Sequence, residues 1–495
     1  MAFDPRYMAD VVEGRFCGST RTQLSQVFSE FKGSPNRYLI LHFHGGLVDR
    51  DTAIDEAVKL NDVYSPVASV LCPIWETGLF EVLRRNWESI AADALYKILI
   101  QRVSGAVHEK ATSVVGTSST TIPQFNLGEM RDSAQGPGEF ANVDTTDWHK
   151  VGGLTSIDSK TVQHQFQGDH ELISGIRHIA AAHHAANAGD GLRGLLDEGV
   201  ALAEAFVADV IDAARDLVGF PSKFILEIVE TVDAVLQRFA SKTDHGLHAT
   251  VTEEILRKFY VDLLGFEIWQ QMKVYTEEAF GSDQSVFFGT ALLEEMAALD
   301  SAKKCVLLVG HSAGSIYACN LLQHARARKV QVPIQVVFLA AAVHDDLFAE
   351  TLDEVGPISD FRLFSMSDQI EQEDNLLGGF GDGTLDWVYP RSLLYFISGC
   401  LEATVDAPIA GLQRDVDPTW QGAGLPSVAT VRGFLTSGTN RTVWTKTEAP
   451  GQNRLSANAI DHGDFGHPEL TSGVTKGQPN LSVHGITQIA ATGNF

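Results

Sequence analysis

The amino-acid sequence predicts an α/β fold, with a mostly parallel sheet and a large, mostly helical insertion. Three observations lead to this prediction. Short apolar segments typical of buried strands alternate with amphipathic segments between residues 37 and 75, and this alternation returns after residue 304. Between these two stretches the pattern is helical or weakly periodic. The chain has 495 residues, of which 44% are hydrophobic, which is enough for a large core and an insertion together.

The first predicted elements form a strand–helix–strand unit. In chain order they are a helix over 20–33, a strand over 37–43, a helix over 51–60 and a strand over 67–75. Two strands that are linked by a helix pair in parallel. No pair of antiparallel strands is evident before residue 37, so we expect the sheet to be shortened at that edge.

The residue pattern in the middle of the chain predicts the insertion. The pattern is helical over 79–107, polar and irregular over 108–170, and helical again over 201–218 and 224–239. A Gly-Phe-Pro break separates the last two helices. The predicted division of the chain is a split α/β core over 1–107 and 251–495, with a helical and loop-rich cap over 108–250.

The last part of the chain returns to alternating strands and helices. The predicted helices cover 251–280, 291–299 and 315–326, and the predicted strands cover 305–309, 334–342, 361–366 and 441–446. These strands extend the parallel sheet that begins with residues 37–43.

Charge and cysteine usage exclude several classes of protein. Lys and Arg total 37 and Asp and Glu total 63, so the formal net charge is −26. A surface this negative repels nucleic acid and anionic lipid. The five cysteines are scattered and form no CxxC pair, so we expect neither a disulfide framework nor a structural zinc site. No signal peptide and no bilayer-length apolar run is evident, so we expect a cytoplasmic protein without a membrane span.

The motif with the strongest chemical meaning follows the predicted strand over 305–309. Gly310, Ser312 and Gly314 form the pattern GxSxG, directly before an apolar-periodic helix. A serine hydroxyl is a weak nucleophile and needs an exposed, strained strand-to-helix turn, where bulky neighbours would clash. The N-terminus of the following helix favours negative charge that develops at the site. The context therefore predicts a nucleophilic serine at position 312.

A glycine loop lies at the end of an earlier strand. His44, Gly45 and Gly46 follow the strand over 37–43, and small residues there let the main chain approach a substrate oxygen. Together with GxSxG, this loop resembles the α/β-hydrolase superfamily over residues 37–80 and 290–470. The resemblance implies that the N–H groups of Gly45, Gly46 and Ala313 form an oxyanion hole. We expect His44, His311 and Trp75 to contact the substrate.

The resemblance also implies the order of the remaining catalytic groups, which is serine, acid, then histidine. Asp368 directly follows the strand over 361–366 and is the expected acid, with the role of orienting an imidazole. The alternatives are Glu371 and Asp374 in the same loop, and Asp345 and Asp346 after the preceding strand. A histidine must then follow the last strand. His462, beside Gly463, is the expected base, with His467 and His484 as alternatives.

These residues together predict a serine hydrolase that cleaves carboxylic esters through an acyl-enzyme. We expect a small-molecule ester as its partner, with no cofactor, no metal and no nucleic acid, while the oligomeric state stays open. Lipase, thioesterase, amidase or peptidase activity would use the same three side chains. A different class, a non-catalytic hydrolase-like scaffold that binds a partner, is the remaining alternative.

Overall fold

The chain is described by a computed structural model. The described residues are 2–46, 48–75, 79–115, 145, 148–150, 154, 157–177, 220–356, 358, 360–376, 385–418, 420, 424–438 and 441–495. The predicted helix over 201–218 and most of the predicted polar stretch over 108–170 lie outside them.

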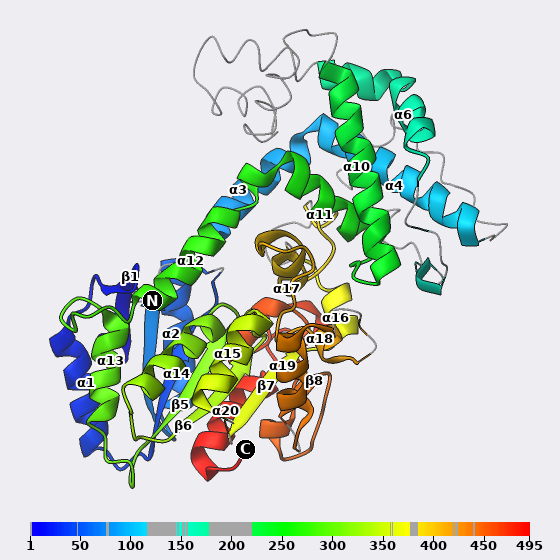
Figure 1. Ribbon diagram of the computed structural model, residues 1–495. Coiled ribbons are helices and arrows are strands. Elements are labelled where there is room, and N and C mark those ends of the chain that lie inside the picture. The colour runs from blue at the N-terminus through cyan, green and yellow to red at the C-terminus, as the bar shows by residue number, and fades with distance from the viewer. Residues whose placement is uncertain are drawn as a thin grey trace, which may run out of the picture.

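An eight-stranded sheet forms the centre of the described chain, with the order β2-β1-β4-β3-β5-β6-β7-β8 (Figure 1). The strands are β1 (Met8–Val12), β2 (Arg15–Phe16), β3 (Tyr38–Phe43), β4 (Ser69–Trp75), β5 (Cys305–His311), β6 (Ile334–Leu339), β7 (Phe361–Met366) and β8 (Thr442–Thr445). Every neighbouring pair is parallel except β1 and β2. The predicted α/β class with a mostly parallel sheet is confirmed.

The direction in which the chain crosses the sheet reverses between β3 and β5. The chain runs from β3 to β4 on one side, whereas β5, β6, β7 and β8 follow one another on the other side. The register pairs Tyr38 with Cys305 and Phe43 with Gly310, so β3 and β5 end at the same level. In open parallel sheets, ligands bind at the carboxyl ends of strands beside such a reversal. The loops after β3 and β5 therefore occupy the position where a site is expected.

The expectation of a shortened edge is wrong, because an N-terminal hairpin completes the sheet. Strands β1 and β2 pair antiparallel, with Val11 opposite Phe16, and β1 pairs in parallel with β4. The turn places Glu13 at φ +50° and Gly14 at φ +71°, which is typical of a tight two-residue hairpin turn. A Cβ on Gly14 would lie 2.6 Å from the main-chain nitrogen of Ala279, so this position requires glycine.

Helices cover both faces of the sheet and extend from it into the insertion. They are α1 (Arg21–Gly33), α2 (Arg50–Tyr64), α3 (Leu79–Ala92), α4 (Ala94–Val115), α6 (Ser159–Gln167), α10 (Phe220–Ser241), α11 (Leu247–Phe259), α12 (Phe266–Glu278), α13 (Phe288–Ala297), α14 (Gly314–Ala327), α15 (Asp345–Val355), α16 (Asp368–Glu373), α17 (Leu393–Phe396), α18 (Gln413–Val416), α19 (Pro426–Thr436) and α20 (Leu481–Thr492). Among the helices of the described residues, none is both long and apolar enough to cross a membrane.

The sheet separates two hydrophobic cores, one on each of its faces. Alternate residues of β3 point to opposite sides, so Leu39 and Leu41 join one core and Ile40 joins the other. Helices α2 and α20 cover the Ile40 face, and α14, α15 and α19 cover the Leu39 face. Burial on both faces explains why the strands appear in the sequence as continuous apolar runs rather than alternating ones.

The described part of the insertion is helical. Helices α3 and α12 lead from the sheet towards α4, α6, α10 and α11 (Figure 1). Helix α10 contains the predicted helix over 224–239, and it packs on α4, α6 and α11. The ends of this helical group differ from the predicted insertion boundaries, since α4 begins at Ala94 and α11 continues to Phe259.

Candidate active site

Ser312 occupies a strained turn between β5 and α14. Its φ is +52°, a left-handed value that is uncommon for residues other than glycine. Two hydrogen bonds to the main chain of Ser312 fix this conformation. The Ser312 N–H donates to the carbonyl of Leu339 at 2.9 Å. The Ser312 carbonyl accepts from the side-chain hydroxyl of Ser315 at 2.6 Å. The turn is therefore held by the neighbouring strand β6 and by the first turn of α14.

The two glycines of the motif are required by close contacts. A Cβ on Gly310 would lie 2.7 Å from the carbonyl oxygen of Gly314, and a Cβ on Gly314 would lie 2.3 Å from the carbonyl oxygen of Phe43. Real Cβ atoms do not approach main-chain atoms this closely. The GxSxG pattern thus follows from the tight packing of α14 against β5 and β3, as the sequence predicts.

The glycine loop after β3 lies against Ser312. A Cβ on Gly45 would lie 3.3 Å from the Cβ of Ser312, and a Cβ on Gly46 would lie 2.9 Å from the Cβ of Ala313. Within the described chain, no hydrogen bond uses the N–H groups of Gly45, Gly46 or Ala313, although all three residues are buried. Buried main-chain donors without an acceptor are rare. These three amides are available to a negatively charged oxygen beside Ser312.

His44 and Trp75 support this loop from behind. One ring nitrogen of His44, Nδ1, lies 2.8 Å from the Gly45 carbonyl, and the other, Nε2, accepts from the Trp75 main-chain N–H at 3.1 Å. The Trp75 indole donates to the His44 carbonyl at 3.2 Å. Neither residue lines the cavity at Ser312. The structure therefore does not place His44 and Trp75 in the predicted contact with substrate, because their polar atoms are used to hold the loop.

A cavity of about 420 Å³ opens over Ser312. Its lining residues come from the loops after β3, β5, β7 and β8, and from α2 and α17. They are Gly45, Gly46, Val48, Asp49, Thr52, Glu56, His311, Ser312, Asp374, Asn375, Leu376, Leu393, Asp461, His462, Gly463, His467 and Thr471. Four segments that are far apart in the sequence thus meet at one edge of the sheet.

His462 reaches this cavity from the loop after β8. The centroid of the His462 ring lies 5.4 Å from the centroid of the His311 ring, and His311 directly precedes Ser312 in the sequence. The loop is fixed by the buried carboxylate of Asp464, which accepts from the main-chain N–H groups of Ile460 and Thr471 at 3.1 and 2.7 Å. The structure thus places His311, Ser312 and His462 around one cavity.

The His462 ring is uncharged and has no hydrogen-bond partner among the described residues. Both ring nitrogens are buried. Burial lowers the pKa of His462 to about 3, because the charged imidazolium loses its hydration. The imidazole is therefore neutral near pH 7 and has a free lone pair.

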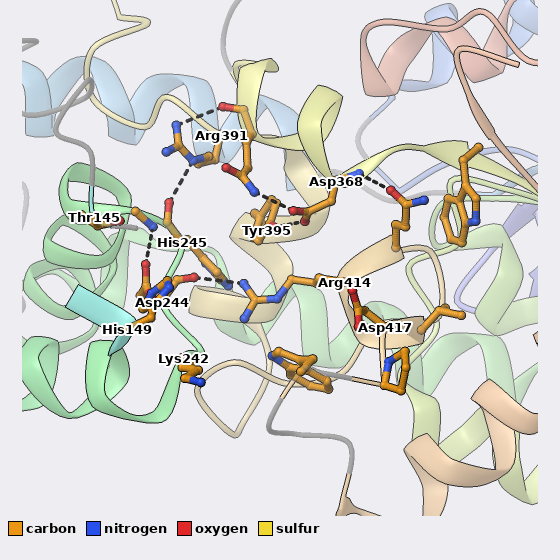
Figure 2. Close-up of a pocket in the computed structure, with 17 residues that line it drawn as sticks. Thr145, His149, Lys242, Asp244, His245, Asp368, Arg391, Tyr395, Arg414 and Asp417 are labelled. Carbon is orange, nitrogen blue, oxygen red and sulfur yellow. Dashed lines mark hydrogen bonds and ion pairs between the residues drawn. The ribbon is translucent and has the colours of Figure 1, made fainter. Parts of the chain in front are cut away.

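The structure places the predicted acid, Asp368, elsewhere. Asp368 begins α16 and points into a second cavity, where its carboxylate accepts from the Tyr395 hydroxyl at 2.5 Å and from the Gln372 amide at 2.6 Å (Figure 2). Its N–H donates to the side chain of Gln413 at 2.8 Å. Asp368 does not line the cavity at Ser312. The helix that starts at Asp368 turns its first side chain towards α17 and α18 rather than towards His462.

Asp374, one of the alternatives, is the carboxylate after β7 that does line the cavity. Its carboxylate accepts from the His462 main-chain N–H at 3.3 Å and from the Asn375 N–H at 2.7 Å. Burial and the neighbouring Asp461 carboxylate raise the pKa of Asp374 well above its ordinary value. Among the carboxyl groups after β7, Asp374 is therefore the one that lines the cavity and is bonded to the main chain of His462.

The remaining alternatives are placed as follows. His467 lines the cavity, with Nε2 3.5 Å from the Glu56 carboxylate, whereas His484 lies on α20 and does not line it. Glu371, Asp345 and Asp346 also lie outside the lining. Glu371 and Asp345 are buried, and Asp346 is exposed.

The second cavity is larger, about 890 Å³, and lies between the insertion side and the segment that connects β7 to β8, with Trp444 of β8 (Figure 2). Its charged side chains are mostly paired. The His149 imidazole contacts Asp244 at 2.5 Å, and the Arg414 guanidinium donates to the carbonyls of Thr243 and Asp244 at 3.0 and 3.1 Å. The Arg391 guanidinium donates to the His245 carbonyl at 2.9 Å. Sequence reasoning did not find this cavity, because its lining comes from segments with no shared motif.

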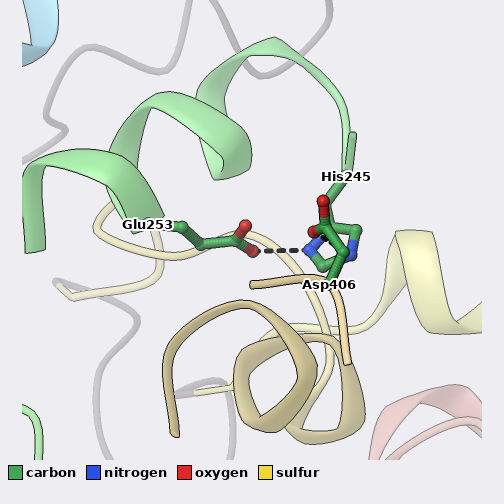
Figure 3. Close-up of side chains that lie close together, drawn as sticks. All are labelled: His245, Glu253 and Asp406. Carbon is green, nitrogen blue, oxygen red and sulfur yellow. Dashed lines mark hydrogen bonds and ion pairs between the residues drawn. The ribbon is translucent and has the colours of Figure 1, made fainter. Parts of the chain in front are cut away.

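A cluster of His245, Glu253 and Asp406 lies near the second cavity and has three potential metal ligands (Figure 3). The His245 ring contacts the Glu253 carboxylate at 2.6 Å. The guanidinium of Arg238 donates to both Glu253 and Asp406, so a protein cation already balances these carboxylates. The cluster is a buried ion-pair network, and its charges do not require a metal ion.

The chain has no match among protein-family models, curated proteins or solved structures. The geometry of the Ser312 cavity is therefore the basis for any functional conclusion.

Proposed function

We propose that this protein is a serine hydrolase that cleaves carboxylic esters, with Ser312 as the nucleophile and an α/β-hydrolase type of core. The observation that carries the proposal is the strained Ser312 at φ +52°, at the end of a central parallel strand and beside a neutral, unpartnered His462. Strain of this kind persists where the surroundings fix it, and it is typical of nucleophile turns.

The chemistry follows from the groups in the cavity. His462 removes the proton from the Ser312 hydroxyl as its oxygen attacks the ester carbonyl carbon. The negative charge that develops on the carbonyl oxygen is stabilised by the unused N–H groups of Gly45, Gly46 and Ala313. His462 then protonates the leaving alcohol, and an acyl group stays on Ser312. Water, activated by the same imidazole, releases the acid and restores the serine.

Asp374 takes the role that the sequence assigned to Asp368. It accepts a hydrogen bond from the main-chain N–H of His462, whose imidazole nitrogens have no partner among the described residues. Catalytic hydrogen bonds are often incomplete before substrate binds. Burial favours the neutral form of Asp374, whereas an imidazolium formed at His462 would favour the ionised form, which orients the ring and stabilises the imidazolium.

Helix α12 lies next to the glycine loop. The Sδ atom of Met272, on α12, lies 2.8 Å from where a Cβ of Gly46 would stand. Helix α12 thus contacts the loop that supplies the oxyanion donors, and it also packs on α14. No residue of the insertion is among the described residues that line the Ser312 cavity, so a capping role for the insertion stays a prediction.

A cytoplasmic location fits the state of the cysteines. All five are free, and Cys72, Cys305, Cys319 and Cys400 are buried thiols inside the α/β core and the helical layer. Free cysteines are typical of a reducing compartment.

The proposal is tested by the hydrolysis of p-nitrophenyl esters. Ser312→Ala should abolish turnover while the circular dichroism spectrum stays that of the wild type. Ser301→Ala, which removes an exposed hydroxyl at the chain's surface, is the matched control and should keep full activity. Wild-type rates in Ser312→Ala would refute the assignment. Matched thioester and anilide substrates then show whether the alternative activities exceed ester cleavage.

A further inference from the structure

The cavity at Ser312 carries an unbalanced set of charges. Carboxyl groups of Asp49, Glu56, Asp374 and Asp461 all line it, whereas no Lys or Arg is among its described lining residues. Its three histidines are His311, His462 and His467, and burial lowers the pKa of each, so they add little positive charge near pH 7. Burial raises the pKa of Glu56, Asp374 and Asp461 as well, so a cation that enters the cavity would favour the ionised forms of these carboxyl groups. A wall of carboxyl groups without a cationic side chain thus favours cationic over anionic substrates.

Three of the four carboxylates already bind main-chain N–H groups. Asp49 accepts from Thr52 N–H at 2.7 Å and caps the start of α2. Asp461 accepts from Gly463 N–H at 2.7 Å, and Asp374 accepts from two N–H groups, as described above. These carboxylates have structural partners without any ligand.

Glu56 is different, because it lacks such a partner. Its side chain is 3% exposed, and its Oε2 atom has no hydrogen-bond partner in the described chain. The nearest charged or polar contact is the His467 ring, 3.5 Å from Oε1. A Cβ on Gly466 would lie 3.0 Å from Oε1, so the glycine leaves room for the carboxylate at this position.

A buried carboxyl group without a partner is unfavourable in its charged form. Burial raises the pKa of Glu56 to about 8. An ammonium group brought into the cavity would supply the missing charge and hydrogen-bond or contact the free oxygen.

The arrangement fits an organic cation better than a metal ion. Within the described residues, His245, Glu253 and Asp406 are the one group of three or more whose ligand atoms converge, and none of them lines this cavity. The carboxylates around Ser312 are spread over the wall instead. A bulky ammonium group can interact with such a wall without coordination geometry, whereas a divalent metal needs converging ligands.

We propose that the Ser312 cavity selects esters that carry a positively charged ammonium group, with Glu56 as the main counter-charge. This inference rests on the proposed hydrolase function and adds a substrate class to it. Esters whose acyl or alcohol part is anionic should be rejected by the same carboxylates.

The first test compares three p-nitrophenyl esters. The cationic 4-(trimethylammonio)butyrate and its neutral isostere 5,5-dimethylhexanoate differ in charge alone. The monoglutarate is the anionic member of the series. Butyrylcholine and 3,3-dimethylbutyl butyrate extend the comparison to the alcohol part. In at least one pair, the cationic ester should have a kcat/KM about tenfold or more above the neutral one at low salt. The anionic ester should be the slowest. Equal kcat/KM for the cationic and neutral members of both pairs overturns the inference.

Glu56→Gln provides the second test, since it removes the charge and keeps the shape. The cationic-to-neutral ratio of kcat/KM should fall towards one, whereas Glu350→Gln, an exposed carboxylate on α15, should keep the wild-type ratio. An unchanged ratio in Glu56→Gln overturns the role of Glu56. If this variant does not fold, the wild-type ester series still decides whether the cavity selects cations.

Calorimetric binding separates this inference from the hydrolase function. Ser312→Ala protein, which cannot form an acyl-enzyme, should bind butyrylcholine more tightly than 3,3-dimethylbutyl butyrate. Selective binding without any ester turnover by the wild type would leave the cation site standing and refute the hydrolase. Turnover of neutral esters without charge preference would leave the hydrolase standing and refute the cation site.

Discussion

The two cavities of this protein differ in how their polar groups are used. The larger one, beside Asp368, has its charged side chains mostly paired with one another or with carbonyls. The smaller one, beside Ser312, has two imidazoles, one carboxylate oxygen and three main-chain N–H groups without partners in the described chain. Folding leaves few buried polar groups unpaired. The difference teaches that unused hydrogen-bonding capacity, rather than size, marks the place where chemistry is expected.

The largest expected effect concerns two of the three histidines that line the smaller cavity. His462→Gln should lower kcat about 10⁴-fold, because it removes the base that activates Ser312. His467→Gln should lower it by less than about tenfold, below the usual contribution of a general base. The measurement is steady-state hydrolysis of a p-nitrophenyl ester. A reversed order would assign the base to His467 and Glu56.

The next effect compares one carboxylate from each cavity. Asp374→Asn should lower kcat about 10²-fold or more, because no carboxylate can then form to stabilise the His462 imidazolium. Asp368→Asn should change kcat by less than about threefold, as substitutions away from the site usually do. The same assay, with thermal unfolding as a check on folding, decides between them. A larger loss in Asp368→Asn would contradict the placement of the acid.

Substitutions at two glycines compare the stability of the packed turn with that of an open helix surface. Gly314→Ala should lower the free energy of unfolding by about 1–3 kcal/mol, because its Cβ would overlap the Phe43 carbonyl. Gly433→Ala, in α19, should raise it by about 0.5–1 kcal/mol, since a Cβ there meets no atom within 4 Å. Urea denaturation measures both changes. Equal effects would show that the turn is looser than described.

The smallest effect is a pH dependence of stability from Glu56. Its folded pKa of about 8 lies above its ordinary value of 4.5, so the native state holds this proton more tightly than the unfolded state. The stabilisation is complete below pH 4.5 and is lost as pH rises through 8. Glu56→Gln avoids this loss.

The unfolding free energy of Glu56→Gln, relative to the wild type, should therefore increase between pH 5 and pH 8.5, with a slope of at most about 1.4 kcal/mol per pH unit. Chemical denaturation at the two pH values measures this difference. Glu350→Gln, at an exposed position, should follow the wild type at both. If the difference in unfolding free energy between Glu56→Gln and the wild type is the same at both pH values, the Glu56 carboxyl group of the wild type is already solvated or paired.

Local signals in the sequence were sufficient for much of the sheet. The buried strands β3, β4 and β5 are nearly continuous apolar runs, and Gly310 and Gly314 mark a turn that tolerates no side chain. These features depend on residues that are close in sequence. The N-terminal hairpin has a local signal as well, the Glu13-Gly14 turn between Val12 and Arg15, but its strands are short and β2 is a single pair of residues.

The identity of the acid depends on contacts that no local pattern reveals. Asp368 and Asp374 both follow β7, and α16 turns them into different cavities. Tyr395 and Gln413, which hold Asp368, come from segments 27 and 45 residues away. For the same reason, the sequence suggested that His44 and Trp75 contact substrate, whereas their hydrogen bonds to each other were not predictable.

The most direct test of the account is covalent labelling of the wild-type protein with a fluorophosphonate, followed by peptide mass spectrometry. The account predicts one modified residue, Ser312, and complete loss of labelling in His462→Gln, where the hydroxyl is no longer activated. Labelling at another serine, or a wild-type protein that stays unmodified under conditions that inactivate known serine hydrolases, would contradict it.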